Sequence, residues 1–226
     1  DFDFGYTGFV QFGLSVRSTS FTYADANGIE CDNENPSSGS TPTTRPTLSN
    51  LTILGNGTSA LTGTLNGARF RRGTDLRFRN SIIAGYGNGV AFENTFAANT
   101  PAFFRNNGVQ GFTTSSTFSG ATGPVGGGCL EVSGALPGDW FNNANPSSLA
   151  AYKSSALVYK PGGPFDPAVA GGVDTNFVSL TVNLLRVGYV GALAPGSPVK
   201  NASGFITSPN NWIAGSAGTW VNFDPQ

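Results

Sequence analysis

Hydrophobic and polar residues alternate in one short pattern that occurs three times between residues 27 and 94. The copies are residues 27–33 (NGIECDN), 66–72 (NGARFRR) and 88–94 (NGVAFEN). In each copy an Asn-Gly pair precedes apolar residues at every second position. Asn-Gly tolerates the left-handed backbone conformation, and period-two alternation is typical of a strand with one buried face. Each copy therefore predicts a corner that leads into a half-buried strand.

A second pattern is interleaved with the first. It reads SNLTILG at residues 49–55 and RNSIIAG at residues 79–85. Two strand types that recur in alternation indicate a unit repeated along an axis. The tightest repeat, from Asn66 to Asn88, is 22 residues long, which fits one coil of a parallel β-helix. We therefore predict an all-β fold, a right-handed parallel β-helix, with loop insertions at residues 34–46 and 56–63.

The repeat is clear only in the first half of the chain. We predict coils over residues 1–130 and an irregular closing region of the same domain over residues 131–226. The closing region holds one candidate short helix at residues 148–158 and one strand pattern at residues 177–182. Its apolar residues near the end of the chain predict a cap: Trp212, Trp220 and Phe223.

The first residues of the chain already show strand alternation. Phe2-Asp3-Phe4 aligns with Ile29-Glu30-Cys31 as an earlier copy of the first pattern. A stack of coils should not begin on an open strand, because unpaired edges invite association. We therefore expect that further coils or a covering element precede Asp1, and that an open coil end can mediate self-assembly.

Aligned copies place residues in columns, because equivalent positions on neighbouring coils lie about 4.8 Å apart. Two columns are structural: an inward apolar column of Phe4, Cys31, Phe70 and Phe92, and an amide column of Asn50 and Asn80. Two outward columns carry charge: Asp3, Glu30, Arg69 and Ala91 in one, and Gly5, Asp32, Arg71 and Glu93 in the other. Opposite charges on adjacent coils predict ion pairs that form a surface ladder.

Composition narrows the function classes. Charged residues make up 11% of the chain, the formal net charge is −1 and histidine is absent. The lack of histidine removes the commonest general base and every nucleophilic triad that contains it. No basic cluster exceeds Arg69, Arg71 and Arg72, so nucleic-acid binding has little support. No apolar run approaches the ~20 residues of a membrane-spanning helix.

Cys31 and Cys129 are the only cysteines. Two cysteines cannot make a structural zinc site by themselves. They form either one disulfide that closes a long loop or two buried thiols. Cys31 occupies the position held by Phe70 and Phe92 in the other copies, which favours burial.

The outward charges are the candidate functional residues. Glu30, Asp32, Arg69 and Arg71 are the candidate binding residues, although a surface charge ladder is the simpler interpretation. The candidate metal ligands are Asp1, Asp3, Glu30 and Asp32, because Ca²⁺ favours clustered carboxylate oxygens; no calcium-loop spacing accompanies them. The same face, with Glu93, could serve a polysaccharide lyase or glycosidase, which needs paired carboxylates or a base beside a bound cation.

Several motifs resemble segments of large secreted proteins from Bacteroidota-type bacteria. They are DFGYTGFVQFGL at residues 3–14, NGIECDN at 27–33, LSNLTILG at 48–55, RRGT at 71–74, YVGA at 189–192 and WVNFDPQ at 220–226. The resemblance implies a secreted or cell-surface parallel β-helix exported by the type IX route. It also implies an acidic segment and coils before Asp1, and a sorting domain after Gln226. It assigns no catalytic residue.

These observations favour a non-catalytic extracellular structural or adhesive protein. Its expected partners are a polysaccharide, a cell-surface protein or further copies of itself, with no nucleic acid and no membrane span. The alternative is a carbohydrate-active enzyme, a polysaccharide lyase or glycosidase, on the same scaffold. An ice- or mineral-binding surface ranks last, because the threonines do not align in register.

Overall fold

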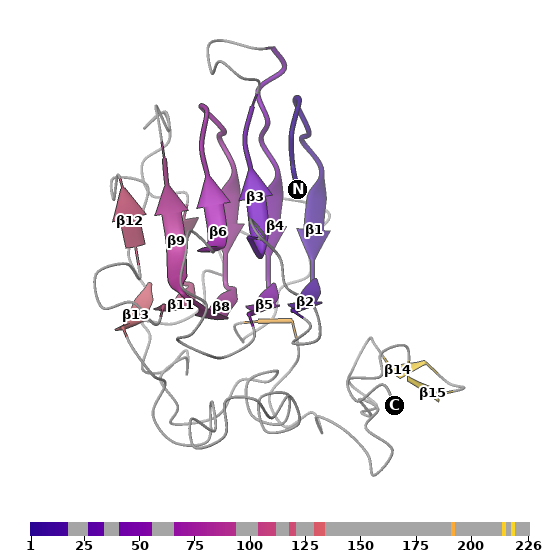
Figure 1. The fold of residues 1–226 in the computed structure, drawn as a ribbon. Helices are drawn as coiled ribbons and strands as arrows, with labels where there is room; N and C mark the ends of the chain where they lie inside the picture. The colour runs from indigo at the N-terminus through magenta and orange to yellow at the C-terminus, as the bar shows by residue number, and fades with distance from the viewer. Residues whose placement is uncertain are drawn as a thin grey trace.

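The computed structural model shows a parallel β-helix, as the sequence predicts (Figure 1). It describes residues 1–17, 27–33, 41–55, 66–93, 104–111, 118–120, 129–133, 191–192, 214–215 and 218–219. Every regular element among these residues is a strand. No helix in the described part of the chain is long and apolar enough to span a membrane.

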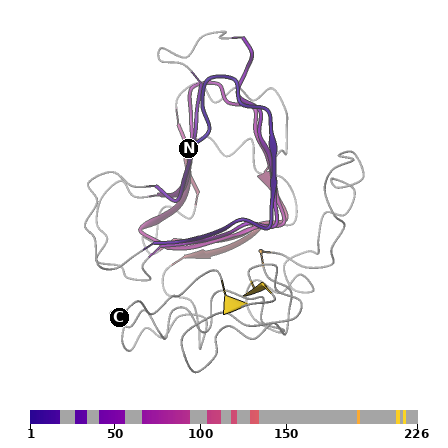
Figure 2. The ribbon, with the colours of Figure 1, turned by 90° about the vertical axis from the view of Figure 1, so that its right-hand side faces the viewer.

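Three parallel sheets form the sides of the coils. Sheet A contains β3 (Ile29–Cys31), β6 (Asn66–Phe70), β9 (Asn88–Phe92) and β12 (Phe118–Gly120). Sheet B contains β1 (Phe9–Gln11), β4 (Thr47–Ser49), β7 (Arg77–Arg79) and β10 (Phe104–Arg105). Sheet C contains β2 (Leu14–Val16), β5 (Thr52–Leu54), β8 (Ile82–Tyr86), β11 (Gly108–Gly111) and β13 (Leu130–Ser133). Viewed along the axis, the coils superimpose around one three-sided outline (Figure 2).

The 22-residue coil is confirmed by the strand register. Asn66 pairs with Asn88 across β6 and β9, and each further coil adds one strand to each sheet. One short antiparallel pair, β14 (Ala214–Gly215) with β15 (Gly218–Thr219), lies outside the three sheets. The described strands of the β-helix run as far as Ser133, so β13 crosses the predicted boundary at residue 130.

Apolar side chains fill the interior of the coils. Cys31, Phe70 and Phe92 pair in one inward column of sheet A, as predicted. Phe78 and Phe104 from sheet B meet Phe70 with ring centroids 6.1 Å away in each case, and they stack on each other at 5.2 Å. Full burial of one such ring contributes about 1.5–3 kcal/mol, so this aromatic stack is a main source of stability.

The predicted column begins with the wrong phenylalanine. Phe2 rather than Phe4 bridges to Cys31, with Phe2 N–H donating to the Glu30 carbonyl and Asp32 N–H donating to the Phe2 carbonyl, both at 3.0 Å. Phe4 is 77% exposed and has a φ of 47°. The chain leaves the sheet two residues earlier than the alternation suggests, because it turns at Phe4 and Gly5, whose φ is 87°.

The left-handed corner also lies elsewhere than predicted. Asn50, Asn80 and Asn106 have φ of 54°, 53° and 55°, and they follow sheet B strands that are in register. Phe12, with a φ of 63°, holds the equivalent place on the first coil. This corner joins sheet B to sheet C, and asparagine suits it because it tolerates the left-handed conformation.

The Asn-Gly pairs do not form that corner, because Asn66 and Asn88 are the first residues of strands β6 and β9. Their glycines serve close packing instead. A Cβ on Gly67 would lie 2.1 Å from Cγ2 of Ile83 and 2.8 Å from the carbonyl oxygen of Gly89. The second residue of the pattern is therefore glycine because sheets A and C approach each other closely there.

Both cysteines are free thiols, so the disulfide alternative does not hold. Cys31 is fully buried, with its Sγ 2.9 Å from the hydroxyl of Thr74, and burial raises the pKa of its thiol to about 12. Cys129 is half-buried, and its Sγ lies 3.5 Å from the Phe104 carbonyl.

A small part of the predicted closing region is described. Gly191 N–H donates to the Asn80 carbonyl and Ala192 N–H donates to the Thr52 hydroxyl, both at 2.8 Å, so this segment lies against the coils. The other elements expected there fall outside the described residues: the helix at 148–158, the strand at 177–182, and Trp212, Trp220 and Phe223. Most of the two predicted loop insertions falls outside them as well.

Candidate functional site

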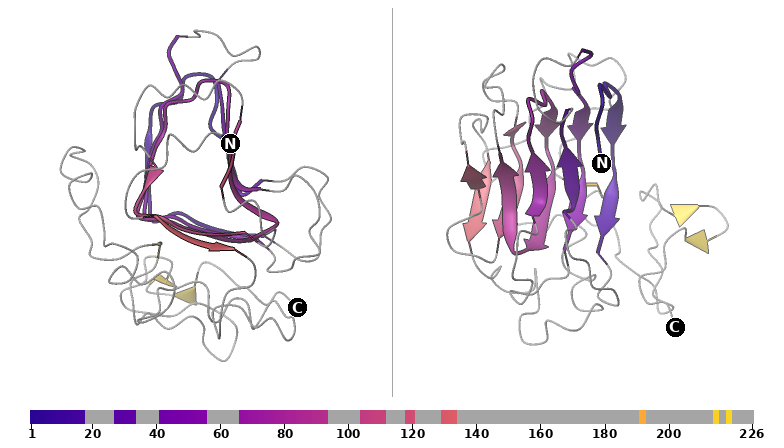
Figure 3. Two further views of the ribbon diagram at one scale, coloured as in Figure 1. Left: turned by 90° about the vertical axis from the view of Figure 1, so that its left-hand side faces the viewer. Right: turned by 45° about the horizontal axis from the view of Figure 1, so that its top comes forward.

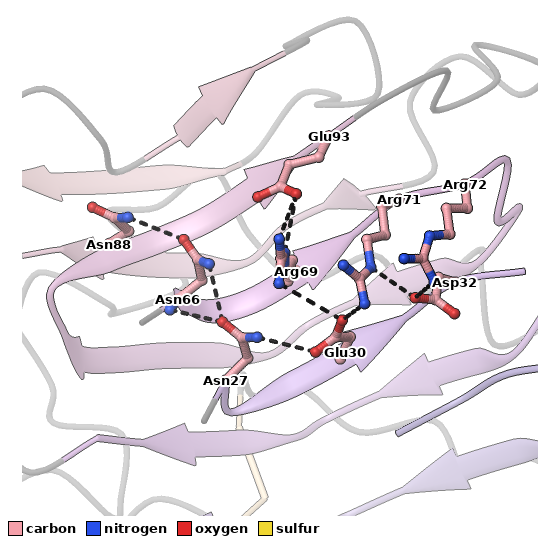
Figure 4. A network of polar contacts seen from close by, with 9 residues as sticks. All are labelled: Asn27, Glu30, Asp32, Asn66, Arg69, Arg71, Arg72, Asn88 and Glu93. Atoms are coloured by element: carbon pink, nitrogen blue, oxygen red, sulfur yellow. Dashed lines mark hydrogen bonds and ion pairs between the residues drawn. The ribbon is translucent and has the colours of Figure 1, made fainter. Parts of the chain in front are cut away.

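A polar network covers the outer face of sheet A. Its side chains come from β3, β6 and β9 and from the residues that flank these strands (Figure 4). The inward neighbours Cys31, Phe70 and Phe92 hold the strands on the core, and the pleat directs the residues between them outward. The network comprises Asn27, Glu30, Asp32, Asn66, Arg69, Arg71, Arg72, Asn88 and Glu93.

Arg69 joins two carboxylates at one end of the network. Its Nη2 lies 2.9 Å from Oε2 of Glu93, and its Nε donates to the same oxygen at 3.0 Å. Its Nη1 lies 3.8 Å from Oε1 of Glu30. The predicted Glu30–Arg69 pair is confirmed. The predicted Arg71–Glu93 pair is not formed, because Glu93 turns to Arg69.

Asp32 is the most enclosed carboxylate of the network. Its side chain is 5% exposed, and its Oδ2 accepts hydrogen bonds from Nε of Arg71 at 2.7 Å and Nη1 of Arg72 at 3.3 Å. Arg71 also forms an ion pair with Glu30. The predicted Asp32–Arg71 pair is therefore confirmed, and Arg72 is a partner that the column alignment did not identify.

An asparagine ladder borders the charged residues. Asn88 Nδ2 donates to Oδ1 of Asn66 at 3.1 Å, and Asn66 Nδ2 donates to Oδ1 of Asn27 at 3.0 Å. Asn27 in turn donates to Oε2 of Glu30 at 3.1 Å. The sequence pattern aligns these three asparagines in one column. Because Asn-Gly was interpreted as a turn signal, hydrogen bonding between their side chains was not predicted.

The predicted amide column of Asn50 and Asn80 lies inside the corner between sheets B and C. Both residues are fully buried. Oδ1 of Asn50 accepts from the Ser49 hydroxyl at 2.8 Å and from Nε2 of Gln11 at 3.2 Å. The amide of Asn50 is thus held by the first coil and by its own chain neighbour, at the corner where the left-handed conformation is required.

The structure brings Asp3 to Asp32 rather than to Glu30, since the first strand is displaced by two residues. The parallel bridge between Phe2 and Cys31 makes Asp3 and Asp32 neighbours on adjacent coils. Burial raises the pKa of the Asp3 carboxyl above its usual range and the negative charge of Asp32 raises it further, while the hydrogen bond from Phe4 N–H, at 2.6 Å, opposes these effects.

The predicted calcium ligands do not form a ready cluster. Among the described residues, no group of three or more acidic, histidine or cysteine side chains is arranged to hold a metal ion. Oxygens of Glu30 and Asp32 already face Arg71. Calcium binding at Asp1, Asp3, Glu30 and Asp32 stays a prediction, and it requires Arg71 to move away from these carboxylates.

The network can bind neutral polar groups more readily than it can transfer protons. Three carboxylates face three guanidinium groups, so the charges balance within the network. A carboxylate whose oxygens already accept hydrogen bonds from guanidinium groups has fewer lone pairs available to take a proton from a substrate. Asp3 is the carboxyl that differs, since its pKa is raised.

Stacked coils of three parallel sheets, with an outward polar face and an aromatic interior, define a parallel β-helix protein. The family model described as the pectate-lyase like beta helix domain matches residues 1–120, which is more than half of the chain. The chain belongs to this family. The match includes all nine residues of the sheet A network. Neither the curated proteins nor the solved structures yielded a match.

Proposed function

We propose that the protein is a non-catalytic extracellular or cell-surface β-helix protein with a structural or adhesive role, and that it binds glycans. The observation that carries the proposal is the balanced network on sheet A, in which each charged residue has an oppositely charged partner. The absence of histidine from the whole chain supports a role without acid–base chemistry. Membership of a pectate-lyase-like family supports a carbohydrate ligand in an extracellular setting.

A paired binding and turnover assay tests the proposal. The protein is incubated with immobilised polysaccharides, and both retention on the polymer and release of reducing or unsaturated sugar ends are measured. Retention without release is expected. Release that rises with protein concentration would replace the proposal by an enzymatic function. If the assay detects neither retention nor release, the proposed glycan ligand is excluded.

The second candidate is a carbohydrate-active enzyme, a lyase or glycosidase. The position of Asp3 beside Asp32 favours it, because a carboxyl with a raised pKa can act as a general acid. Asp3→Asn would abolish such an activity, whereas Asp75→Asn, which changes a carboxylate outside the network, would retain it. Activity that survives Asp3→Asn would exclude Asp3 as its general acid, and absence of any release from wild-type protein would exclude the enzyme.

Secretion by the type IX route is a further part of the proposal. It rests on the resemblance of the motifs at residues 3–14, 27–33 and 220–226 to exported β-helix proteins of Bacteroidota-type bacteria. Fractionation of the source cells, with detection of the natural protein in the medium and on the surface, tests this part. Retention of the protein inside the cells would contradict it.

Calcium is a proposed ligand at Asp1, Asp3, Glu30 and Asp32. Carboxylate oxygens are the ligands that Ca²⁺ prefers, and Asp3 already lies against Asp32. Calorimetric unfolding with added Ca²⁺ and with EDTA measures the effect. A higher melting temperature with Ca²⁺ supports the site. An unchanged melting temperature excludes it.

A further inference from the structure

The chain contains five Asn-Gly pairs, the dipeptide most prone to spontaneous deamidation. Hydroxide takes the proton of the glycine amide, and the glycine nitrogen attacks Cγ of the asparagine side chain. The N–Cγ bond forms, the Cγ–Nδ2 bond breaks and ammonia leaves. Water then opens the resulting succinimide ring to aspartate or isoaspartate. Glycine favours this reaction because it has no side chain to hinder the attack and its backbone rotates freely.

Four of the five pairs lie in the described coils, and they begin at Asn27, Asn66, Asn88 and Asn107. The fifth, at Asn56, falls outside the described residues. The coils superimpose when they are viewed along the axis, so equivalent positions stack on one another (Figure 3). The first three pairs contribute the asparagine ladder of sheet A. The pair at Asn107 instead lies between β10 of sheet B and β11 of sheet C.

Close packing requires the glycine of these pairs. A Cβ on Gly28 would lie 2.4 Å from the carbonyl oxygen of Gly67 and 2.5 Å from Cγ2 of Ile53. Gly67 is confined in the same way by Ile83 and Gly89. The ladder in turn requires an amide side chain, which can donate and accept at once. The stacking of the coils therefore imposes the dipeptide that is chemically least durable.

Both reacting groups of the first pair are held in hydrogen bonds. Gly28 N–H donates to the Asn66 carbonyl at 2.9 Å. Oδ1 of Asn27 accepts from the backbone N–H and from Nδ2 of Asn66, both at 3.0 Å, and Nδ2 of Asn27 donates to Glu30 at 3.1 Å. Ring closure turns Cγ of the asparagine towards the glycine nitrogen, so it requires these bonds to break first.

The pair at Asn107 is held in the same way by different partners. Gly108 N–H donates to the Ser81 carbonyl at 2.9 Å. Oδ1 of Asn107 accepts from Ser81 N–H at 2.9 Å, and its Nδ2 donates to the Phe78 carbonyl at 3.2 Å. The residue is 1% exposed, so water has little access to it. This pair is therefore protected independently of the ladder.

Asn66 occupies the middle of the ladder and is 2% exposed. Its Nδ2 donates to Asn27 and its Oδ1 accepts from Asn88. Deamidation would replace Nδ2 by an oxygen that faces Oδ1 of Asn27, and isoaspartate would also add a methylene group to the backbone of β6. Either product would disrupt the pairing of three coils.

We propose that the asparagine ladder and the hydrogen bonds between coils protect the Asn-Gly pairs of the β-helix from deamidation. The amide contacts hold each Cγ away from the glycine nitrogen, and strand pairing occupies the glycine N–H. The ladder thus extends the chemical lifetime of the fold as well as joining its coils. The inference goes beyond the proposed function, because it does not depend on any ligand.

Peptide mapping by mass spectrometry tests the protection. The chain of residues 1–226 is held at mildly alkaline pH, once folded in buffer and once unfolded in guanidinium chloride, and conversion of Asn27, Asn66, Asn88 and Asn107 is followed. We expect each rate in the folded protein to be at least about a hundredfold lower, because attack waits for the paired strands to open. Similar rates in the two states would overturn the proposal.

Two ladder variants separate the ladder from folding in general. Asn27→Ala removes the acceptor of the Asn66 amide, and Asn88→Ala removes its donor. In each variant deamidation at Asn66 should be at least about tenfold faster than in wild-type protein, and the rate at Asn107 should stay unchanged. The second variant keeps the test decisive if circular dichroism shows that the first does not fold.

Asn80→Ala is the matched control, because it alters the corner between sheets B and C and leaves the ladder residues intact. We expect Asn66 to deamidate in this variant at close to the wild-type rate. An unchanged rate at Asn66 in the folded ladder variants, or an equal acceleration in Asn80→Ala, would overturn the role of the ladder.

Discussion

At the scale of single residues, backbone conformation and burial explain why a particular residue type occupies a position for which the sequence alone shows no clear preference. Asn50, Asn80 and Asn106 are asparagine because the corner between sheets B and C needs a left-handed residue on every coil. Cys31 occupies a position that phenylalanine fills on the next two coils, so it acts as a small core residue rather than as a redox group.

Asn80→Ala should lower the free energy of unfolding by about 1–2 kcal/mol, because alanine is strained in the left-handed conformation. Asn80→Gly keeps that conformation accessible and removes only the amide contacts, so it should cost less. Urea denaturation of the two variants measures the difference. If alanine and glycine cost the same, the side-chain contacts and not the φ angle determine the choice of asparagine.

Cys31 should remain unreactive towards a thiol reagent at pH 8 in the folded protein, whereas the half-buried Cys129 should react. The thiol pKa of Cys31 rises from 9.0 to about 12 on folding, so the folded state retains a proton that the unfolded state loses in this window. Stability should therefore fall by about 1.4 kcal/mol per pH unit as pH rises from 9 towards 12.

A Cys31→Ala variant provides the control for this pH dependence. Tyr86 is also buried, with a pKa raised to about 12, and it contributes to the fall in both proteins. The difference in unfolding free energy between wild-type protein and the variant isolates the thiol. A difference that is independent of pH between 9 and 12 would show that Cys31 does not carry this linkage.

At the scale of the elements, the sheets differ in what they present to solvent. Sheet A presents a balanced ion-pair network, and sheet B presents arginines with an exposed phenylalanine. Outward residues of sheet C, such as Thr52, Leu54 and Ile82, are buried, and the Gly191–Ala192 segment lies against this sheet. The outward residues Thr47, Ser49 and Arg79 of sheet B are buried as well. Among the described residues, sheet A and the exposed side chains of Phe9, Arg77 and Arg105 on sheet B therefore offer candidate binding groups.

Asp32→Asn should destabilise the protein by about 2–4 kcal/mol, because Arg71 and Arg72 lose a carboxylate whose side chain is only 5% exposed. Glu93→Gln is the control: Glu93 is 34% exposed, and its loss should cost no more than about 1 kcal/mol. Chemical denaturation compares the two variants. Equal costs would mean that burial does not control the strength of these pairs.

At the scale of the whole molecule, the large apolar side chains that are exposed among the described residues belong to the first coil. Phe4 and Tyr6 are 77% and 40% exposed, and β1 and β2 are the last strands in the order of their sheets at that end. Edges of this kind pair with other chains. We expect residues 1–226 to self-associate through the first coil in a concentration-dependent manner.

Sedimentation velocity over a range of concentrations measures this association. Phe4→Lys should shift the distribution towards monomer, because a charge on the edge opposes edge-to-edge pairing. High salt should not dissociate the oligomer, because salt screens charge–charge interactions and has little effect on apolar burial or backbone hydrogen bonds. A monomer at all concentrations in wild-type protein would contradict the prediction.

Sequence periodicity was sufficient for the architecture and for part of the site. Position-by-position alignment of the Asn-Gly copies placed Glu30 beside Arg69 and Asp32 beside Arg71, and both pairs form. The same alignment was wrong for Phe4, because a turn that displaces the chain by two residues keeps the alternation intact. It was also wrong for Glu93, since a long arginine side chain can reach a carboxylate diagonally as easily as directly across.

The repeated Asn-Gly pattern by itself determined the coil length, the parallel stacking and the inward column of Cys31, Phe70 and Phe92, because a period of two separates buried from exposed positions wherever strands stack in register. Only the tertiary structure decided which residues adopt the left-handed conformation and which carboxylate each arginine binds. It also decided that Arg77 and Arg105 share a face, since they come from separate coils and meet only when the chain is wound.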